Sequence, residues 1–153
     1  MNLTYNKTTT YSFILLLVLV VPIGIVHELG HALVCYGENL TVELRFAGFG
    51  LATKCSAQPV NFTVFTASGS LLAMLTSLLP LLFFRQNHIK IACLTLALTH
   101  GLNGLVETVL FDSYIRNITL YMAIINTVMI IIFIMLLAKL NSKTVNQTSL
   151  VKK

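Results

Sequence analysis

Two histidines and a glutamate stand close together as His27-Glu28-Leu29-Gly30-His31, which is the pattern H-E-x-x-H. Residues four apart on a helix lie one turn from each other on the same face. Both imidazoles can therefore bind one Zn²⁺ through nitrogens at about 2.0–2.1 Å. Glu28 lies about 100° further round the helix, where it can hold a proton without ligating the metal. The chemistry that this pattern predicts is attack by a zinc-acidified water, with Glu28 as general base and then general acid.

A second group of polar side chains stands in a later apolar segment. His100, Asn103 and Glu107 follow one another at i, i+3 and i+7, which places them on one face of a helix. Asp112 stands at the end of the same segment. Ionisable groups inside an apolar span are costly and are functional candidates by default. We therefore expect the two groups to meet in one site.

The composition of the chain is far from that of a soluble domain. Charged residues make up 10% of the 153 residues, against a norm of about 25%, and hydrophobic residues make up 56%. These values, with a mean hydropathy of +0.86, exclude a disordered chain, a coiled coil and an ordinary cytosolic enzyme. They indicate a single integral membrane domain over residues 1–153. The net charge of +5 comes without basic runs, so we expect the lipid bilayer, and not nucleic acid, as a partner.

The apolar residues fall into four stretches that are long enough to span a bilayer, which takes about 20 helical residues. Between the first two, residues 41–46 alternate polar and apolar side chains like a strand, and residues 47–50 form a turn signal. We expect an all-α membrane protein with about four transmembrane helices and a short β-hairpin insertion between the first and second. The expected spans are residues 12–36, 62–84, 91–111 and 118–138, with a polar tail over 139–153. In the second span, residues 68–70 (Ser-Gly-Ser) favour close helix packing.

The three cysteines, Cys35, Cys55 and Cys93, are odd in number and widely spaced, with no C-x-x-C pair. This pattern indicates neither a disulfide framework nor a cysteine zinc site. We expect each cysteine to be a small buried apolar side chain.

The basic residues predict an orientation in the membrane. With four spans, both tails and the loop at 85–90 share one side, which carries seven of the ten Lys and Arg residues. The other side carries Arg45, Lys54 and Arg116. The side with the excess of basic residues is cytoplasmic by the positive-inside rule, so both tails are predicted to lie in the cytoplasm.

An H-E-L-G-H sequence within a hydrophobic helix resembles the site-2 protease family of intramembrane zinc metalloproteases. The resemblance covers residues 20–115. It implies a zinc metalloendopeptidase that cleaves membrane-embedded or membrane-proximal peptides, with His27 and His31 as ligands and Glu28 as the catalytic residue. The family's second hallmark is an Asn shortly before an Asp that is the third ligand, and its best counterparts here are Asn103 and Asp112. The resemblance also implies a zinc site that faces the cytosol, opposite to the orientation that the basic residues predict.

The identity of the third ligand stays open between two carboxylates. Asn103 and Asp112 are nine residues apart with no proline between them, and Ser113 stands where the family usually has Gly. On a continuous helix Asn103 and Asp112 face opposite ways, so Asp112 reaches the site only if the helix breaks before it. Glu107 shares a face with Asn103 and is the rival ligand, and His100 is the least favoured. We expect Asp112 to ligate, and Asn103 either to contact an oxyanion or the substrate backbone or to form an interhelical hydrogen bond.

Two other functions fit the same residues. A non-catalytic membrane protein would retain the metal for structure or for binding a partner, and His100 or Glu107 would then close the fourth coordination position. A zinc-free helical scaffold would use His27 and Glu28 only for hydrogen bonds between helices.

Overall fold

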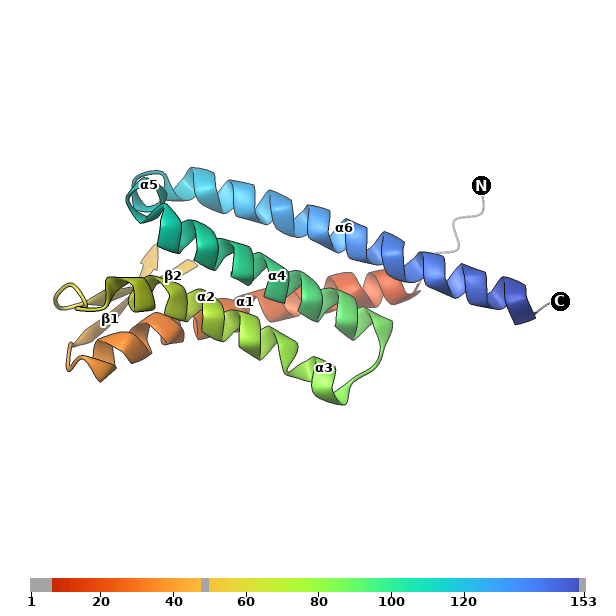
Figure 1. Cartoon of the computed structure of the whole chain (residues 1–153), viewed down its shortest axis with the longest axis horizontal. Coiled ribbons are helices and arrows are strands. Elements are labelled where there is room, and N and C mark those ends of the chain that lie inside the picture. Colours follow the sequence, from red (N-terminus) through yellow and green to blue (C-terminus); the bar gives the residue numbers. More distant parts are fainter. Residues whose placement is uncertain (1–6, 48–49, 152–153) are drawn as a thin grey trace.

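The computed structural model describes the backbone of residues 7–47 and 50–151, and the side chains of residues 7–46 and 51–139. Long helices form a bundle with a two-stranded hairpin at one end (Figure 1). The elements are, in chain order, α1 (Lys7–Gly37), β1 (Val42–Ala47), β2 (Gly50–Cys55), α2 (Phe62–Leu78), α3 (Pro80–Phe83), α4 (Asn87–Val109), α5 (Phe111–Arg116) and α6 (Ile118–Val151).

Among the described residues, four helical stretches are long and apolar enough to cross a membrane. They are Lys7–Gly37, Phe62–Phe83, Asn87–Val109 and Ile118–Lys139. The prediction of an all-α chain with four such helices, and a hairpin between the first and second, is confirmed.

Some helix bounds differ from the prediction. The first helix begins at Lys7 and continues through Pro22. The second span is divided because α2 ends at Leu78 and α3 begins with Pro80, a residue that lacks an N–H and is favoured in a first turn. The last helix continues to Val151, beyond the apolar stretch Ile118–Lys139, so the predicted polar tail is helical over its described residues.

The helices at the centre of the bundle approach closely at small residues. α4 packs against α1, α2 and α6. Where α1 meets α2, a Cβ added to Gly30 would lie 2.5 Å from the backbone oxygen of Ser68. Where α4 meets α2, a Cβ added to Gly104 would lie 2.6 Å from the Cβ of Ser70. The predicted role of residues 68–70 in close helix packing is therefore confirmed.

The start of α2 is tied to the end of α1 by one carboxylate. Glu38 accepts hydrogen bonds from the backbone N–H groups of Val60 at 2.6 Å and Asn61 at 3.1 Å. The side chain of Asn61 accepts in turn from the N–H of Val64 at 3.2 Å. The first N–H groups of a helix have no partner within it, so the bond from Val64 to Asn61 caps α2. The contacts of Glu38 hold the chain that leads into α2 beside the end of α1.

The predicted hairpin is present, with β1 and β2 paired antiparallel from Val42↔Cys55 to Ala47↔Gly50. Residues 48 and 49 of the predicted turn lie outside the described residues. β2 lies against α1, and the hydroxyl of Thr53 donates to the backbone oxygen of Glu28 at 2.9 Å. The hairpin therefore covers the part of α1 that carries the H-E-x-x-H residues.

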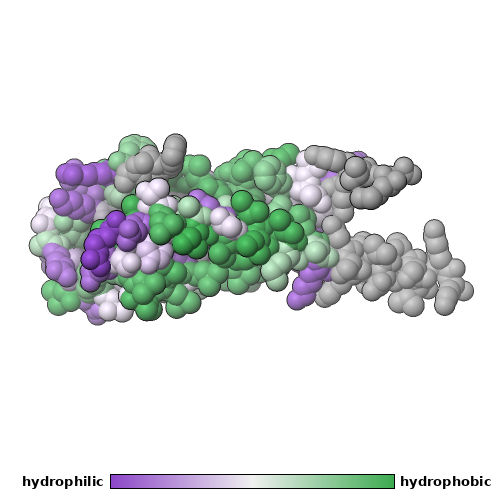
Figure 2. Space-filling view, turned by 90° about the horizontal axis from the view of Figure 1, so that it is seen from above, coloured by the Kyte–Doolittle hydropathy of each residue, from purple (hydrophilic) through white to green (hydrophobic). Residues whose placement is uncertain are grey.

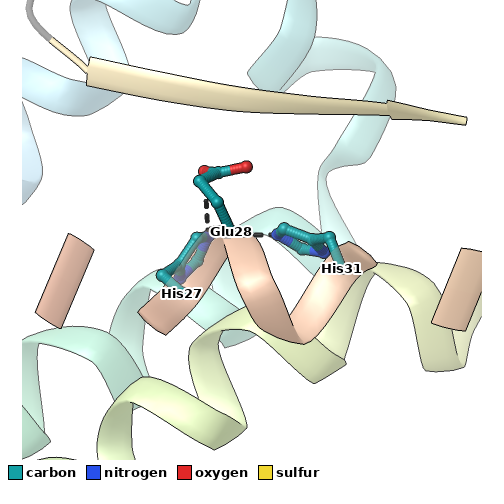
Figure 3. Close-up of side chains that lie close together, drawn as sticks. All are labelled: His27, Glu28 and His31. Carbon is teal, nitrogen blue, oxygen red and sulfur yellow. Dashed lines mark hydrogen bonds and ion pairs between the residues drawn. The ribbon is translucent and has the colours of Figure 1, made fainter. Parts of the chain in front are cut away.

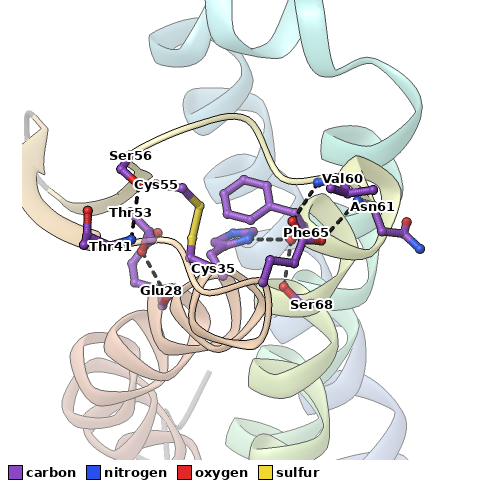
Figure 4. The surroundings of a disulfide bond; sticks show 12 residues. Glu28, Cys35, Thr41, Thr53, Cys55, Ser56, Val60, Asn61, Phe65 and Ser68 are labelled. Carbon is purple, nitrogen blue, oxygen red and sulfur yellow. Dashed lines mark hydrogen bonds between the residues drawn. A yellow bond between two sulfur atoms is a disulfide. The ribbon is translucent and has the colours of Figure 1, made fainter.

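A disulfide joins the hairpin to the first helix (Figure 4). Cys35, in the last part of α1, is bonded to Cys55 at the end of β2, with their Cα atoms 5.8 Å apart. The expectation that these two cysteines are separate apolar side chains is wrong, because the hairpin folds back and brings Cys55 onto α1. Cys93 is free and buried, as expected.

The outside of the bundle is apolar over most of its length. Figure 2 shows hydrophobic side chains over the middle of the molecule and hydrophilic side chains gathered mainly at the hairpin end. Among the described side chains of α6, only Phe133 is buried, although nearly all of them are apolar. The exposed apolar side of α6 is not covered by another described helix, so it is suited to contact with lipid.

Candidate metal centre

His27 and His31 lie one turn apart on the inward face of α1 (Figure 3). Both side chains are buried, and their Nε2 atoms are 3.1 Å apart. Two ligand atoms of a tetrahedral zinc, each at 2.0–2.1 Å from the ion, are separated by about 3.4 Å. The spacing of the two nitrogens therefore suits a shared metal ion.

Glu107 brings a carboxylate from α4 to the same point. Its Oε1 lies 3.4 Å from Nε2 of His31, and its Oε2 lies 3.6 Å from Nε2 of His27. The side chain is only 7% exposed and faces no Lys or Arg within ion-pair distance among the described residues. Two imidazole nitrogens and one carboxylate thus stand at the mutual spacing of three tetrahedral ligands.

Asp112 is not brought to the histidines. α4 ends at Val109, and Leu110 leaves the helix (φ −117°, ψ 29°) before the chain turns into α5. The break that Asp112 needs is therefore present, but it directs the Asp112 side chain to the exposed surface. Within the part of the chain that the structure describes, this carboxylate forms no ion pair and no hydrogen bond. Of the two carboxylates, only that of Glu107 lies beside the histidines, because Glu107 is on the inward face of α4 ahead of the break.

α2 supplies the groups that orient the two imidazoles. Nδ1 of His31 donates to the backbone oxygen of Phe65 at 2.7 Å, which leaves the lone pair of a neutral ring on Nε2. Nδ1 of His27 lies 3.4 Å from the hydroxyl of Ser70. A backbone oxygen or hydroxyl on the second ring nitrogen is the usual support of a metal-ligating histidine. Neither Phe65 nor Ser70 was predicted, because the sequence does not show which turn of α2 faces α1.

Asn103 and His100 complete the inward face of α4. The amide of Asn103 donates to the hydroxyl of Ser70 at 3.3 Å and is 3.5 Å from Oε2 of Glu107. The predicted interhelical hydrogen bond of Asn103 is thus present, and its oxyanion or substrate contact stays a prediction. The ring of His100 lies 5.6 Å from that of His27, centroid to centroid. The predicted stripe of His100, Asn103 and Glu107 therefore faces the histidine pair.

Two polar atoms at this face are buried without a hydrogen-bond partner, Nδ1 of His100 and Oδ1 of Asn103. Buried polar groups are nearly always partnered, so such atoms indicate a further polar group in the site, such as an ion or a water. The clustered nitrogens and carboxylates are donor types that a metal ion such as Zn²⁺ accepts, so a metal is one group that the residues present could hold.

Glu28 lies beside the two histidines. Its carboxylate extends from α1 toward β2, and its Oε1 lies 4.0 Å from Nε2 of His27 (Figure 3). The ligand atoms of His27, Glu28 and His31 all lie within 4.8 Å of one another. Glu28 is therefore close to the cluster and beside the hairpin, where a proton could be exchanged with a bound molecule.

Tyr114, in α5, covers the end of the site and was not singled out by the sequence. Its side chain is buried and its hydroxyl donates to the sulfur of Met122 at 3.6 Å. Burial raises the pKa of Tyr114 to about 12, and the nearby charges of Glu107 and Glu28 act in the same direction. The phenol thus stays a neutral donor near these carboxylates.

The site thus brings two histidines together with the carboxylates of Glu28 and Glu107, a grouping whose side chains could hold a metal ion. The cluster lies among the ends of helices long and apolar enough to cross a membrane. Comparisons of the chain with protein-family models, with curated proteins and with solved structures found no match.

Proposed function

We propose that the chain is a multi-pass integral membrane protein and a zinc metalloendopeptidase that hydrolyses peptide bonds within or beside the bilayer. One observation carries the proposal: Glu107 on α4 reaches the two histidines of α1 at 3.4 and 3.6 Å, with Glu28 beside them. Ionisable groups in apolar helices are costly, and a shared metal gives this set a function. The resemblance of H-E-L-G-H to the site-2 proteases supports the same reaction.

His27, His31 and Glu107 would hold the metal. With three protein ligands, a fourth coordination position is left for water or substrate, as in catalytic zinc sites. A bound zinc ion would lower the pKa of its water and polarise the scissile carbonyl. Phe65 and Ser70 keep the imidazoles in the orientation that this requires.

Glu28 is the proposed general base and acid. Its carboxylate takes a proton from the attacking water and gives a proton to the leaving nitrogen of the cleaved bond. The residue suits this task because it is close to His27, at 4.0 Å, without belonging to the tight ligand set.

The hairpin provides a place for the substrate backbone. A helical peptide hides its carbonyls in internal hydrogen bonds, so a cleavable segment must be extended. β2 lies over α1 and contacts the backbone of Glu28 through Thr53. A peptide that pairs with the hairpin as a further strand would be held extended beside Glu28.

A closed structural metal site is the second candidate, and His100 is the observation that favours it. Its ring lies beside that of His27, and its Nδ1 is buried without a partner. If His100 were a fourth ligand, no position would remain for water. A His100→Ala variant that loses zinc would support the structural site, whereas retained zinc would support the open one.

The experiment that tests the activity uses purified protein in lipid vesicles. The substrate is a library of leucine-rich transmembrane peptides with randomised polar flanks, and products are identified by mass spectrometry. Glu28→Gln should keep its zinc and lose about 10²–10⁴-fold in rate, as for loss of a general acid–base group. Asp112→Asn is the matched control, because Asp112 carries an exposed carboxylate that does not lie beside the histidines. Zinc-loaded protein that cleaves no better than Glu28→Gln would contradict the proposal.

A further inference from the structure

We infer that the hairpin end of the bundle, and with it the opening of the metal centre, faces the non-cytoplasmic side of the membrane. The inference rests on the disulfide, the distribution of basic residues and the depth of the site. The orientation in the membrane does not depend on the proposed reaction.

The disulfide is the first observation. Cys35 and Cys55 are bonded at the end of the bundle where α1 passes into the hairpin (Figure 4). Structural disulfides persist in oxidising compartments and are rare where thiols are kept reduced. The third cysteine, Cys93, lies inside the bundle on α4 and is free. The end of the molecule that carries the bond therefore faces an oxidising compartment.

The basic residues are the second observation. Arg85 lies in the short loop before α4 and Lys90 in the first turn of α4. Lys7 and Lys139 lie at the same end of the bundle, where α1 begins and the last apolar stretch ends (Figure 1). In the sequence Lys143, Lys152 and Lys153 come after them. The hairpin end carries Arg45, Lys54 and Arg116.

The opposite end thus carries four basic side chains in the described part of the chain, with three more lysines after it in the sequence, against three at the hairpin end. An excess of Lys and Arg marks the cytoplasmic side, which is then the end opposite to the hairpin. The disulfide and the basic residues thus give the same orientation by independent physical routes.

The depth of the ligands is the third observation. His31 lies six residues before the end of α1 at Gly37, and Glu107 lies two residues before the end of α4 at Val109. At 1.5 Å per residue these positions are within about 10 Å of the hairpin end. Glu28 also points toward β2 (Figure 3). Water and an extended peptide would therefore reach the centre from the hairpin side.

The consequence for the substrate rests on the proposed function. A protease with this orientation would cut membrane-anchored proteins near the non-cytoplasmic ends of their spans. Its substrates would be segments that are unfolded on the non-cytoplasmic side. The site would face away from the cytosol, unlike the cytosol-facing site that the family resemblance implies.

The test is thiol accessibility in bacterial spheroplasts, with a membrane-impermeant maleimide–polyethylene glycol as the probe. All variants carry Cys93→Ala, so that an added cysteine is the only free thiol while the disulfide is intact. Ala57→Cys reports the exposed chain after β2, and Gln86→Cys, equally exposed, reports the opposite end. We expect Ala57→Cys to react in intact spheroplasts and Gln86→Cys to react only after permeabilisation.

The opposite pattern, or reaction of both positions in intact spheroplasts, would overturn the inference. A second measurement is used if one of the two introduced cysteines reacts poorly with the maleimide probe. Free thiols are blocked in intact cells, and the protein is then denatured with and without reductant. Cys35 and Cys55 should take up the probe only after reduction, and free thiols at both would overturn the inference. Neither readout depends on zinc or on cleavage, so a failed protease assay leaves this test unaffected.

Discussion

The carboxylate of Glu107 lies 3.4 Å from Nε2 of His31, although the two residues belong to different helices far apart in the sequence. The contact exists because α4 packs between α1 and α6, with its stripe of polar residues turned toward the H-E-x-x-H face of α1. The proposed metal binding would therefore depend on the docking of α1, α2 and α4, and not on the H-E-x-x-H sequence alone.

Ser70 should be needed for metal affinity. Its hydroxyl lies 3.4 Å from Nδ1 of His27 and accepts from the amide of Asn103, so Ser70→Ala removes a support from a ligand and from its neighbour. Loss of such a partner costs about 10–100-fold in affinity. Ser77→Ala is the control, since Ser77 is also buried in α2 but bonds only to the backbone oxygen of Ala73. Competition with a calibrated zinc chelator measures both, and equal affinities would show that Ser70 does not support the site.

Gly30 should be intolerant of a side chain. A Cβ there would lie 2.5 Å from the backbone oxygen of Ser68, so Gly30→Ala forces α1 and α2 apart. Overpacking of this kind costs about 1–3 kcal/mol. Gly24→Ala, on the same helix with no atom within 4 Å of the added Cβ, should be neutral or slightly stabilising. Thermal unfolding in detergent checks the pair, and equal melting temperatures would contradict the close packing.

The disulfide should stabilise the fold by holding the hairpin on α1. Its ends are 20 residues apart, and closing a loop of this size is worth about 3 kcal/mol. Added reductant should therefore lower the melting temperature of the wild type and leave a Cys35→Ala/Cys55→Ala variant unchanged. A melting temperature that does not respond to reductant would mean that the hairpin is held without this bond.

The features that the sequence predicted are those that depend on local periodicity. Four apolar stretches, one alternating segment and the i, i+4 spacing of His27 and His31 are each determined within one element. The stripe of His100, Asn103 and Glu107 could be predicted for the same reason, since it follows from the helical repeat of α4.

The features that the sequence did not predict depend on how helices and strands pack together and where they end. Whether the carboxylate of Glu107 or that of Asp112 lies beside the histidines depends on the direction of the chain after Leu110, which local sequence does not fix. The Cys35–Cys55 bond depends on the hairpin folding back over α1, and the contact of Phe65 with His31 depends on which turn of α2 faces it. Both are tertiary relationships between segments that are distant in the sequence.

The most direct test of the account is the zinc content per chain of protein purified in the presence of zinc, measured by mass spectrometry for two isosteric variants. The wild type and Asp112→Asn should each hold about one zinc, as a three-residue site requires, and Glu107→Gln should lose it while keeping its helical circular dichroism. Zinc that is retained in Glu107→Gln and lost in Asp112→Asn would contradict the assigned ligand set. A wild type without zinc would contradict the metal centre itself.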